Sequence, residues 1–248
     1  VRTGMQNAPP GIGRRSDVAR QSYQEQLEAL RENVLYMSEV VLERLRLGLD
    51  ALEQKDVDLA WEVIEGDDEI NEMYLDLEKQ CIDLLALQQP VASDLRFITA
   101  SFKIITDLER IADLATNLGD YTLQAKGDLY PEVDIQEIGS VTLEMVEDAM
   151  DAYAEENVDA GYEIDERDDV IDEFCARSSQ VVVRDLIETQ LEDVGDGEDG
   201  DGEEVERLMA DVSRLLLTIR DLERVGDHAV NIAARTLYMV ENDDTLIY

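Results

Sequence analysis

The sequence predicts an all-α protein built as two tandem three-helix bundles that are related by an internal duplication. Its composition favours helix, because only four prolines and three phenylalanines occur in 248 residues while Leu, Ala, Glu and Arg are abundant. Apolar residues recur at helical spacing, and a polar motif returns in the second half of the chain. No alternation of the kind that predicts a strand competes with these signals.

The duplication is visible in two segments. The motif at 107–117 returns at 221–231, a shift of 114 positions (221 − 107), with Asp, Leu, Glu, Arg, Asp, Ala and Asn in register. Several residues of 50–72 recur in 151–173 at a shift of 101 (151 − 50). The two shifts differ by 13 residues (114 − 101), so the second copy contains about that many additional residues. The run 195–204, which holds only Gly, Asp and Glu, is the expected place for them and is predicted to be a solvated loop between two helices. This loop lacks the ordered ligand positions of a calcium-binding EF-hand.

Six helices are expected, and their ends carry recognisable signals. The expected ranges are 17–54, 56–88, 91–126, 131–156, 158–193 and 203–241. Asp56 and Asn157 lie at equivalent places of the repeat, at the starts of the second and fifth expected helices, where each can cap the helix. Pro90 ends the second helix, because the residue before a proline avoids the helical region. Ser93 then lies where the third helix needs a cap.

The same signals divide the chain into two bundles. Gly127 suits the end of the third helix, and Pro131 suits the first turn of the fourth. The expected organisation is a flexible leader at 1–16, a first bundle at 17–127, a second bundle at 131–241 and a tail at 242–248. Short links between long amphipathic helices favour this bundle arrangement.

The charge is extreme, with 21 basic against 60 acidic residues and a net charge of −39. A field this negative repels nucleic-acid phosphates and anionic membranes, so we expect no nucleic-acid partner. An acidic, lysine-poor surface suits a halophilic protein, because the Debye length is about 3 Å at 1 M salt and self-repulsion is screened. Most carboxylates are therefore expected to serve solvation alone.

We expect a cytoplasmic protein. No run of about 18 apolar residues could insert in a membrane, and no secretory signal precedes the first helix. Cys81 and Cys175 lie in apolar settings at non-equivalent places of the repeat. They are expected to be buried free thiols in a reducing compartment.

In a chain this acidic, many pairs of carboxylates four residues apart are expected by chance. With 60 carboxylates in 248 residues, random placement gives roughly 14 such pairs. The pairs Glu109/Asp113 and Glu223/Asp227 differ from random pairs because they recur in register and continue an apolar stripe. The stripe residues are Leu95, Ile98, Phe102 and Ile105, and in the second copy Leu208, Val212, Leu215 and Ile219. Asn117 extends the first pair by one more turn on the same helix face.

Each half has a second polar pair on its preceding helix, Asp67 with Asn71 and Asp168 with Asp172. If neighbouring helices pack so that these pairs face Glu109/Asp113 and Glu223/Asp227, four oxygen-bearing side chains converge in each half. Oxygen-only sets suit hard or borderline cations such as Mg²⁺, Mn²⁺ or iron. The alternative is that both sets are solvated or salt-bridged surface.

Four segments together resemble the PhoU family of phosphate-uptake regulators, in family order from about residue 20 to 240. They are Val63-Ile-Glu-Gly-Asp67-Asp-Glu-Ile-Asn71, Asp94-Leu-Arg96, Asp107-Leu-Glu-Arg-Ile-Ala-Asp113 and Leu222-Glu-Arg-Val-Gly-Asp227. The resemblance implies a six-helix fold with pseudo-twofold symmetry and no catalytic activity. It also implies a regulator that restrains phosphate import through the ATP-binding subunit of an ABC transporter, with a sensor kinase as a second partner and a homodimer as the expected assembly.

The resemblance further implies multinuclear iron or zinc clusters on the bundle surface. The family's ligand motifs fall on Asp67, Asn71, Glu109, Asp113, Asp168, Asp172, Glu223 and Asp227. Asn71 departs from the family's carboxylate and removes one charge from the first site. Ala112, where the second copy has Gly226, and the acidic loop at 195–204 are further departures.

Other functions stay open or are disfavoured. A di-iron oxidase needs Glu-x-x-His on two helices, whereas His228 is the single histidine and is expected on a helix surface. No phosphate loop, nucleophile elbow or Cys–His pairing predicts hydrolysis. A regulator of a low-affinity, non-ABC phosphate carrier and a metal-binding helical scaffold without a transport role remain as alternatives.

Overall fold

The computed structural model describes residues 12–87, 90–125, 133–195 and 202–247, and these ranges are helical without a strand. The helices are α1 (Ile12–Gln54), α2 (Val57–Glu65), α3 (Asp67–Leu87), α4 (Ala92–Gln124), α5 (Ile135–Glu155), α6 (Asp159–Gly195) and α7 (Gly202–Glu241). The predicted all-α class is confirmed. The prediction of an unbroken second helix was wrong, because α2 and α3 are separate.

The break between α2 and α3 lies at Gly66, and a side chain from α1 contacts both helices there. Arg44 donates to the carbonyl oxygen of Glu62 at 3.1 Å and pairs with Glu69 at 3.2 Å, so its guanidinium bridges the two helices. A Cβ at Gly66 would fall 2.1 Å from the guanidinium carbon of Arg44, so any other residue here would displace the Arg44 side chain from its present position. The equivalent position in the second half is Arg167, and α6 runs through it without interruption.

The predicted helix starts were correct in two cases. Asp56 caps α2 by accepting from the backbone N–H groups of Asp58 and Leu59. Asn157 accepts from the N–H of Asp159 at 3.1 Å, at the start of α6.

One predicted cap and two predicted starts were wrong. Helix α1 begins at Ile12 instead of 17, so residues 12–16 of the predicted leader are helical. Ser93 is not the cap of α4, because that helix begins at Ala92 and Val91 precedes it without a side-chain hydrogen bond. The fourth predicted helix, α5, begins at Ile135 instead of 131, because the carboxylate of Asp134 caps it through the N–H of Glu137. Gly127 and Pro131 lie outside the described residues.

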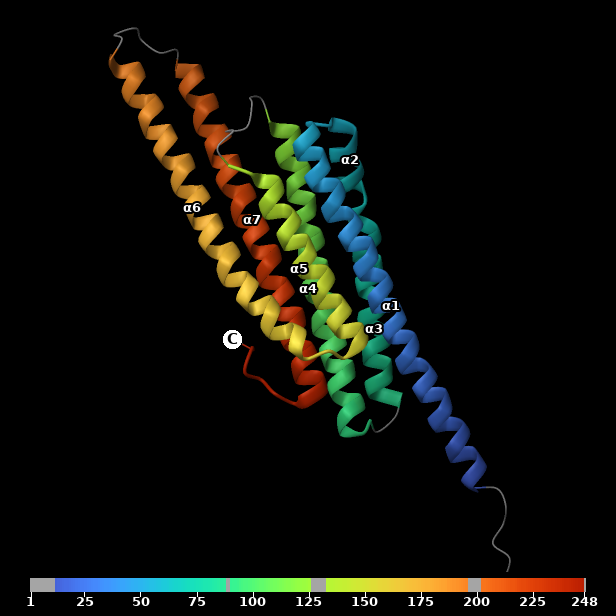
Figure 1. Cartoon of the computed structure of the whole chain (residues 1–248). Coiled ribbons are helices and arrows are strands. Elements are labelled where there is room, and N and C mark those ends of the chain that lie inside the picture. The colour runs from blue at the N-terminus through green and yellow to red at the C-terminus, as the bar shows by residue number, and fades with distance from the viewer. Residues whose placement is uncertain (1–11, 88–89, 126–132, 196–201, 248) are drawn as a thin grey trace, which may run out of the picture.

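The molecule consists of two helical bundles that pack side by side (Figure 1). The first half consists of α1, α2–α3 and α4, and the second of α5, α6 and α7. Helices α4 and α7 pack along each other at the centre, and α1 packs beside α5. One continuous apolar core passes through both halves, with Ile98, Ile105 and Ile219 of the predicted stripes buried. Leu95 is 43 % exposed, so its assignment to the core stripe was wrong.

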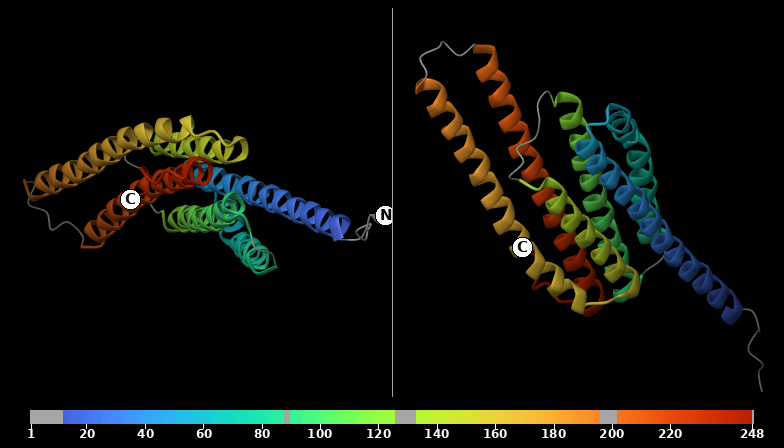
Figure 2. Two further views of the ribbon diagram at one scale, coloured as in Figure 1. Left: turned by 90° about the horizontal axis from the view of Figure 1, so that it is seen from below. Right: turned by 45° about the horizontal axis from the view of Figure 1, so that its top comes forward.

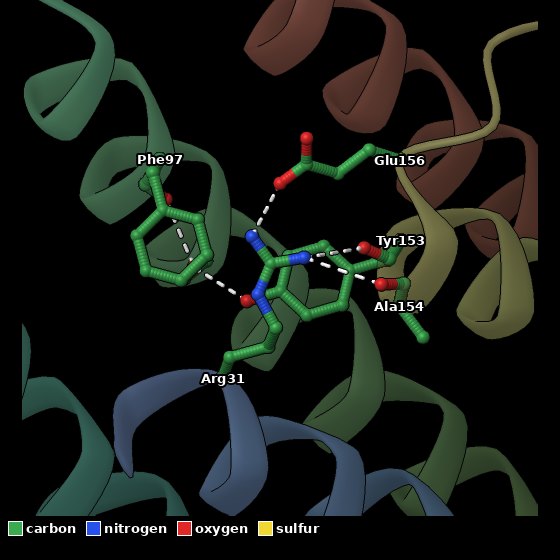
Figure 3. Close-up of polar contacts among 6 residues, drawn as sticks. Arg31, Phe97, Tyr153, Ala154 and Glu156 are labelled. Carbon is green, nitrogen blue, oxygen red and sulfur yellow. Dashed lines mark hydrogen bonds and ion pairs between the residues drawn. The ribbon is translucent and has the colours of Figure 1, made fainter. Parts of the chain in front are cut away.

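The halves are also joined at the C-terminal end of α5 by Arg31 of α1 (Figure 3). Its guanidinium carbon lies 5.0 Å from the ring centroid of Phe97 and 5.8 Å from that of Tyr153. It donates to the carbonyl oxygens of Tyr153 and Ala154 and pairs with Glu156 at 2.5 Å. A cation here satisfies carbonyls that a helix end leaves without partners.

The two ends of the molecule differ (Figure 2). The beginning of α1 projects beyond the bundle at one end, and the α6–α7 hairpin projects at the opposite end. After α7, the chain turns back towards the start of α6 (Figure 1).

Cys81 and Cys175 are buried and free, as predicted. No helix in the described ranges is both long and apolar enough to span a membrane.

Candidate functional site

The eight predicted ligand residues lie in two groups, one in each half. Asp67 and Asn71 on α3 face Glu109 and Asp113 on α4, and we call these four the first-half ridge. The second-half ridge consists of Asp168 and Asp172 on α6 and Glu223 and Asp227 on α7. Helix packing places the ridges because i, i+4 residues share a face and α3–α4 and α6–α7 are neighbours.

In the first-half ridge, one carboxylate accepts hydrogen bonds from neighbouring side chains. Asp67 accepts from the amide nitrogen of Asn71 at 2.8 Å and from the hydroxyl of Thr116 at 3.5 Å. Burial raises the pKa of Glu109, and the charges of Asp113 and Asp67 raise it further. Burial and the charge of Asp67 likewise raise the pKa of Asp113, which Arg224 partly offsets. The three carboxylates therefore repel one another.

The second-half ridge has four carboxylates and less compensation. Burial, followed by the charges of Asp172 and Asp227, raises the pKa of Asp168 to about 7. Burial raises the pKa of Asp172 and of Glu223 too, and neighbouring carboxylates raise both further. Arg220 offsets this only in part for Glu223. Loss of a proton from Asp168 near neutrality would therefore concentrate negative charge on this ridge.

One oxygen of the second-half ridge is especially informative. The Oδ1 atom of Asp168 is buried and has no hydrogen-bond partner. A Cβ at Gly226 on α7 would lie 2.8 Å from this oxygen, so the absence of a side chain leaves it room. A buried carboxylate oxygen without a donor is costly unless a cation or a proton satisfies it.

This chemistry fits a hard or borderline cation at the second-half ridge, because four carboxylates supply oxygen ligands and one of those oxygens lacks a partner. In the described part of the chain, however, no three His, Cys, Asp or Glu side chains converge closely enough to ligate one ion. Ligation therefore requires side-chain rotation, which the exposed Asp172 and Asp227 are free to make. All eight residues stay predicted ligands.

Asn117 does not extend the first-half ridge, contrary to the expectation. Its amide nitrogen donates to Asp221 of α7 at 3.1 Å, and the hydroxyl of Tyr121 donates to the same carboxylate at 2.8 Å. Asp221 is only 5 % exposed. Asn117 thus belongs to a polar contact between the halves.

His228 is buried, so the prediction of a surface histidine was wrong. Its Nδ1 lies 2.9 Å from Oδ1 of Asp107 on α4, and Asn231 donates to that oxygen at 3.5 Å. Asp107 with Asn231 and Asp221 with Asn117 are reciprocal pairs of the repeat across the α4–α7 interface. We call these two contacts the α4–α7 seam. The Asp and Asn residues of the α4–α7 seam occupy the same positions in both copies of the repeat, and this was the sequence signal that could have identified the seam.

A model of the PhoU domain matches residues 34–122 and 135–236. The two starts differ by 101 positions (135 − 34) and the two ends by 114 (236 − 122), which are the shifts of the internal repeat. The chain is 33 % identical over 228 residues to the phosphate-specific transport system accessory protein PhoU homolog of Pseudomonas aeruginosa, covering 90 % of this chain and 87 % of that protein. It is 30 % identical over 221 residues to the accessory protein PhoU of Escherichia coli, covering 88 % and 85 %.

Solved structures show the same architecture. The crystal structure of PhoU from Pseudomonas aeruginosa aligns with a TM-score of 0.76 at 32 % identity, covering 89 % of this chain and 100 % of that one. The phosphate transport system regulatory protein PhoU from Streptococcus pneumoniae aligns with a TM-score of 0.77 at 27 % identity, covering 89 % and 98 %. The two-bundle arrangement is therefore shared with experimentally determined folds.

Proposed function

Because this chain belongs to the PhoU family, we propose that it is a regulator of phosphate transport. The observation that carries the proposal is the similarity, over about nine-tenths of the chain, to proteins named as accessory proteins of phosphate-specific transport systems. The role is regulatory and not catalytic, since those relatives are accessory proteins. We propose that it acts on the cytoplasmic side of the membrane.

The proposed mode of action is protein–protein contact that restrains phosphate import. The partner we propose is the ATP-binding subunit of a phosphate ABC transporter, with a sensor kinase as a second partner. Long helix faces support docking of this kind, because helical bundles offer extended surfaces to a partner helix or segment. A low-affinity, non-ABC phosphate carrier is the alternative transport partner. We also propose that the protein assembles as a homodimer.

Deletion of the gene tests this role. Cells without the protein should take up phosphate without restraint in phosphate-rich medium, and re-expression should restore control. A pull-down in concentrated salt should recover the nucleotide-binding subunit of a transporter. Normal control of uptake in the deletion strain, together with an empty pull-down, would contradict the proposal.

We further propose that the ridges bind metal ions, with iron or zinc as the first candidates and manganese or magnesium as alternatives. Asp168, Asp172, Glu223 and Asp227 would hold the ion in the second half, and Asp67, Asn71, Glu109 and Asp113 in the first. The bound ion would supply positive charge that offsets carboxylate repulsion. The unpartnered oxygen of Asp168 supports the second-half ridge as the tighter site.

A further inference from the structure

Helix α6 carries three exposed residues at heptad spacing. Glu163, Val170 and Arg177 are seven positions apart, so they share one side of the helix, and we call them the α6 face. Among the large apolar side chains of the described ranges, Val170 is the most exposed, at 63 %. Helix α6 lies at the outer edge of the molecule (Figure 1). The α6 face is therefore accessible to another molecule.

The first half shows that the composition of this face is a departure from the repeat. The equivalents at the shift of 101 (170 − 69) are Glu62, Glu69 and Asp76, which are all carboxylates. An entirely acidic face suits solvation and repels a second copy of itself. The second half replaces two of these three carboxylates, one by valine and one by arginine, and so loses that repulsion.

The α6 face borders a groove between α5 and α6. The groove has a volume of 690 Å³, and its apolar lining consists of Val141, Val170, Ile171 and Phe174. Arg167 holds α6 against α5, because its guanidinium pairs with Glu144 at 3.2 Å and also with Asp148. Apolar surface is thus presented beside the α6 face on two helices that are fixed to each other.

The two charges of the α6 face are not used within the chain. Arg167 is paired, whereas neither the guanidinium of Arg177 nor the carboxylate of Glu163 forms an ion pair in the part of the chain that the structure describes. Glu137 and Glu166 line the same groove without pairing with Arg177. One positive and one negative charge, on opposite sides of an exposed valine, are therefore available to a partner.

We propose that the α6 face is the interface of a homodimer in which the α6 helices of two copies pack antiparallel, with a twofold axis at Val170. Residues equidistant from position 170 then face one another. Glu163 and Arg177 lie seven positions before and after it (170 − 163 and 177 − 170), so Glu163 meets Arg177 of the partner subunit, twice. The inference rests on the homodimer proposed above and names its interface.

The second copy is the occupant because the α6 face is complementary to itself. In the antiparallel pair each charge meets its opposite and the two valines meet at the axis, whereas a parallel pair would place like charges together. Concentrated salt favours this dimer. It screens the repulsion between two chains of net charge −39, while burial of the apolar surface still drives association.

Sedimentation equilibrium of the full chain in molar salt tests the interface. The wild type should have twice the 28.0 kDa mass of one chain. Val170→Asp should weaken the dimer by about tenfold or more, because it places two like charges at the axis. Val57→Asp is the matched control, since Val57 is 52 % exposed on α2 of the first half, and it should leave the dimer unchanged. Equal helicity of the variants by circular dichroism excludes unfolding as the cause.

Charge reversal tests the antiparallel arrangement. Glu163→Arg alone and Arg177→Glu alone should each weaken the dimer, because each places like charges opposite one another. The double variant exchanges the two charges and leaves the net charge unchanged, so it should dimerise as the wild type does. Such a recovery requires that the two positions face each other across the interface.

Several results would overturn the proposed interface. They are a monomeric wild type, a dimer that Val170→Asp leaves intact, and equal weakening by Val170→Asp and Val57→Asp. Failure of the double charge variant to recover would overturn the antiparallel arrangement. A dimer that survives Val170→Asp would keep the homodimer and reject only this interface. Phosphate uptake in the deletion strain is measured separately, so the interface and the regulatory role can fail independently.

Discussion

The two acidic ridges occupy equivalent places, but their equivalent carboxylates Asp67 and Asp168 differ in hydrogen bonding. Asp67 in the first half receives hydrogen bonds from Asn71 and Thr116, whereas Oδ1 of Asp168 in the second half is buried without a partner. Three replacements at equivalent positions produce this difference. They are Asn71 by Asp172, Thr116 by Val230 and Ala112 by Gly226.

This difference teaches that duplication can keep the positions of carboxylates while changing what satisfies them. The first half supplies its own donors. The second half removes both donors, adds a charge and opens room at Gly226 beside the bare oxygen. A site that stores repulsion in this way is stabilised by a ligand that brings positive charge.

Removal of salt should have the largest effect, and it should affect the second half first. A net charge of −39 repels itself once dilution lengthens the Debye length from about 3 Å to tens of Å. The thermal midpoint should fall by more than about 10 °C between molar and millimolar salt. Circular dichroism measures the midpoint, and hydrogen exchange should locate the earliest opening in α6 and α7. An unchanged midpoint would contradict the halophilic interpretation.

Metal-free protein should lose stability between about pH 4 and pH 7 because of Asp168. Its pKa is raised to about 7 in the folded state from 3.8, so the folded state holds the proton that the unfolded state releases. Stability is therefore highest below the unfolded pKa and declines as pH rises to the folded pKa. After discounting for solvent screening, the loss is about 2 kcal/mol.

Asp168→Asn should abolish this loss and raise the unfolding free energy at pH 8 by the same amount, measured by chemical denaturation of metal-free protein. Asp67→Asn is the matched control from the first-half ridge. It should stabilise the protein much less, because relief of the repulsion with Glu109 and Asp113 is offset by disturbance of the hydrogen bonds that Asp67 already accepts. Equal stabilisation by the two variants would remove the distinction between the ridges.

Gly226→Ala should have a smaller effect with opposite signs in two measurements. The new Cβ would lie 2.8 Å from Oδ1 of Asp168, so the carboxylate must move outwards. Metal-free protein should gain up to about 1 kcal/mol, since alanine favours helix and the bare oxygen is released. The stabilisation by added metal should shrink. The reverse change in the first half, Ala112→Gly, should cost about 1 kcal/mol and leave metal stabilisation unaltered.

The smallest predicted effect concerns the α4–α7 seam. Asn117→Ala should cost about 1 kcal/mol, because its 3.1 Å hydrogen bond to buried Asp221 is lost. Asn231→Ala should cost less than about 0.5 kcal/mol, because Asn231 lies 3.5 Å from Asp107 and His228 remains as a partner at 2.9 Å. Chemical denaturation at fixed salt measures both, and the reverse order would show that the seam is not organised as described.

Periodicity and the repeat predicted the helices and their grouping, because these features depend on residues close in sequence. The break at Gly66 was not predictable from α2 and α3 themselves, since Arg44 of α1 bridges them from a different part of the chain. Ser93 looked like a cap by residue type, but α4 begins one residue before it at Ala92. Short-range signals therefore located helices better than their ends.

The ridges were predictable because their carboxylates recur at i, i+4 spacing in both copies. The seam was not recognised, although its Asp and Asn residues recur in the same motif. Asn117 and Glu109 share a helix face by spacing alone, and only the approach of α7 separates their roles. Burial of His228 depends likewise on α4, which supplies Asp107 from 121 residues away in the sequence.

The most direct test of the central claim is metal content measured by mass spectrometry on protein purified without chelator. Wild-type protein should carry more than one ion, and Glu223→Gln with Asp227→Asn should empty the second-half ridge while the helices stay folded. The equivalent pair Glu109→Gln with Asp113→Asn should remove the more weakly held ion and leave the tighter one, since four carboxylates bind more strongly than three and an amide. Equal metal content in wild type and both variants, or none in any of them after growth with ample iron and zinc, would contradict the claim that the second-half ridge is a cation site.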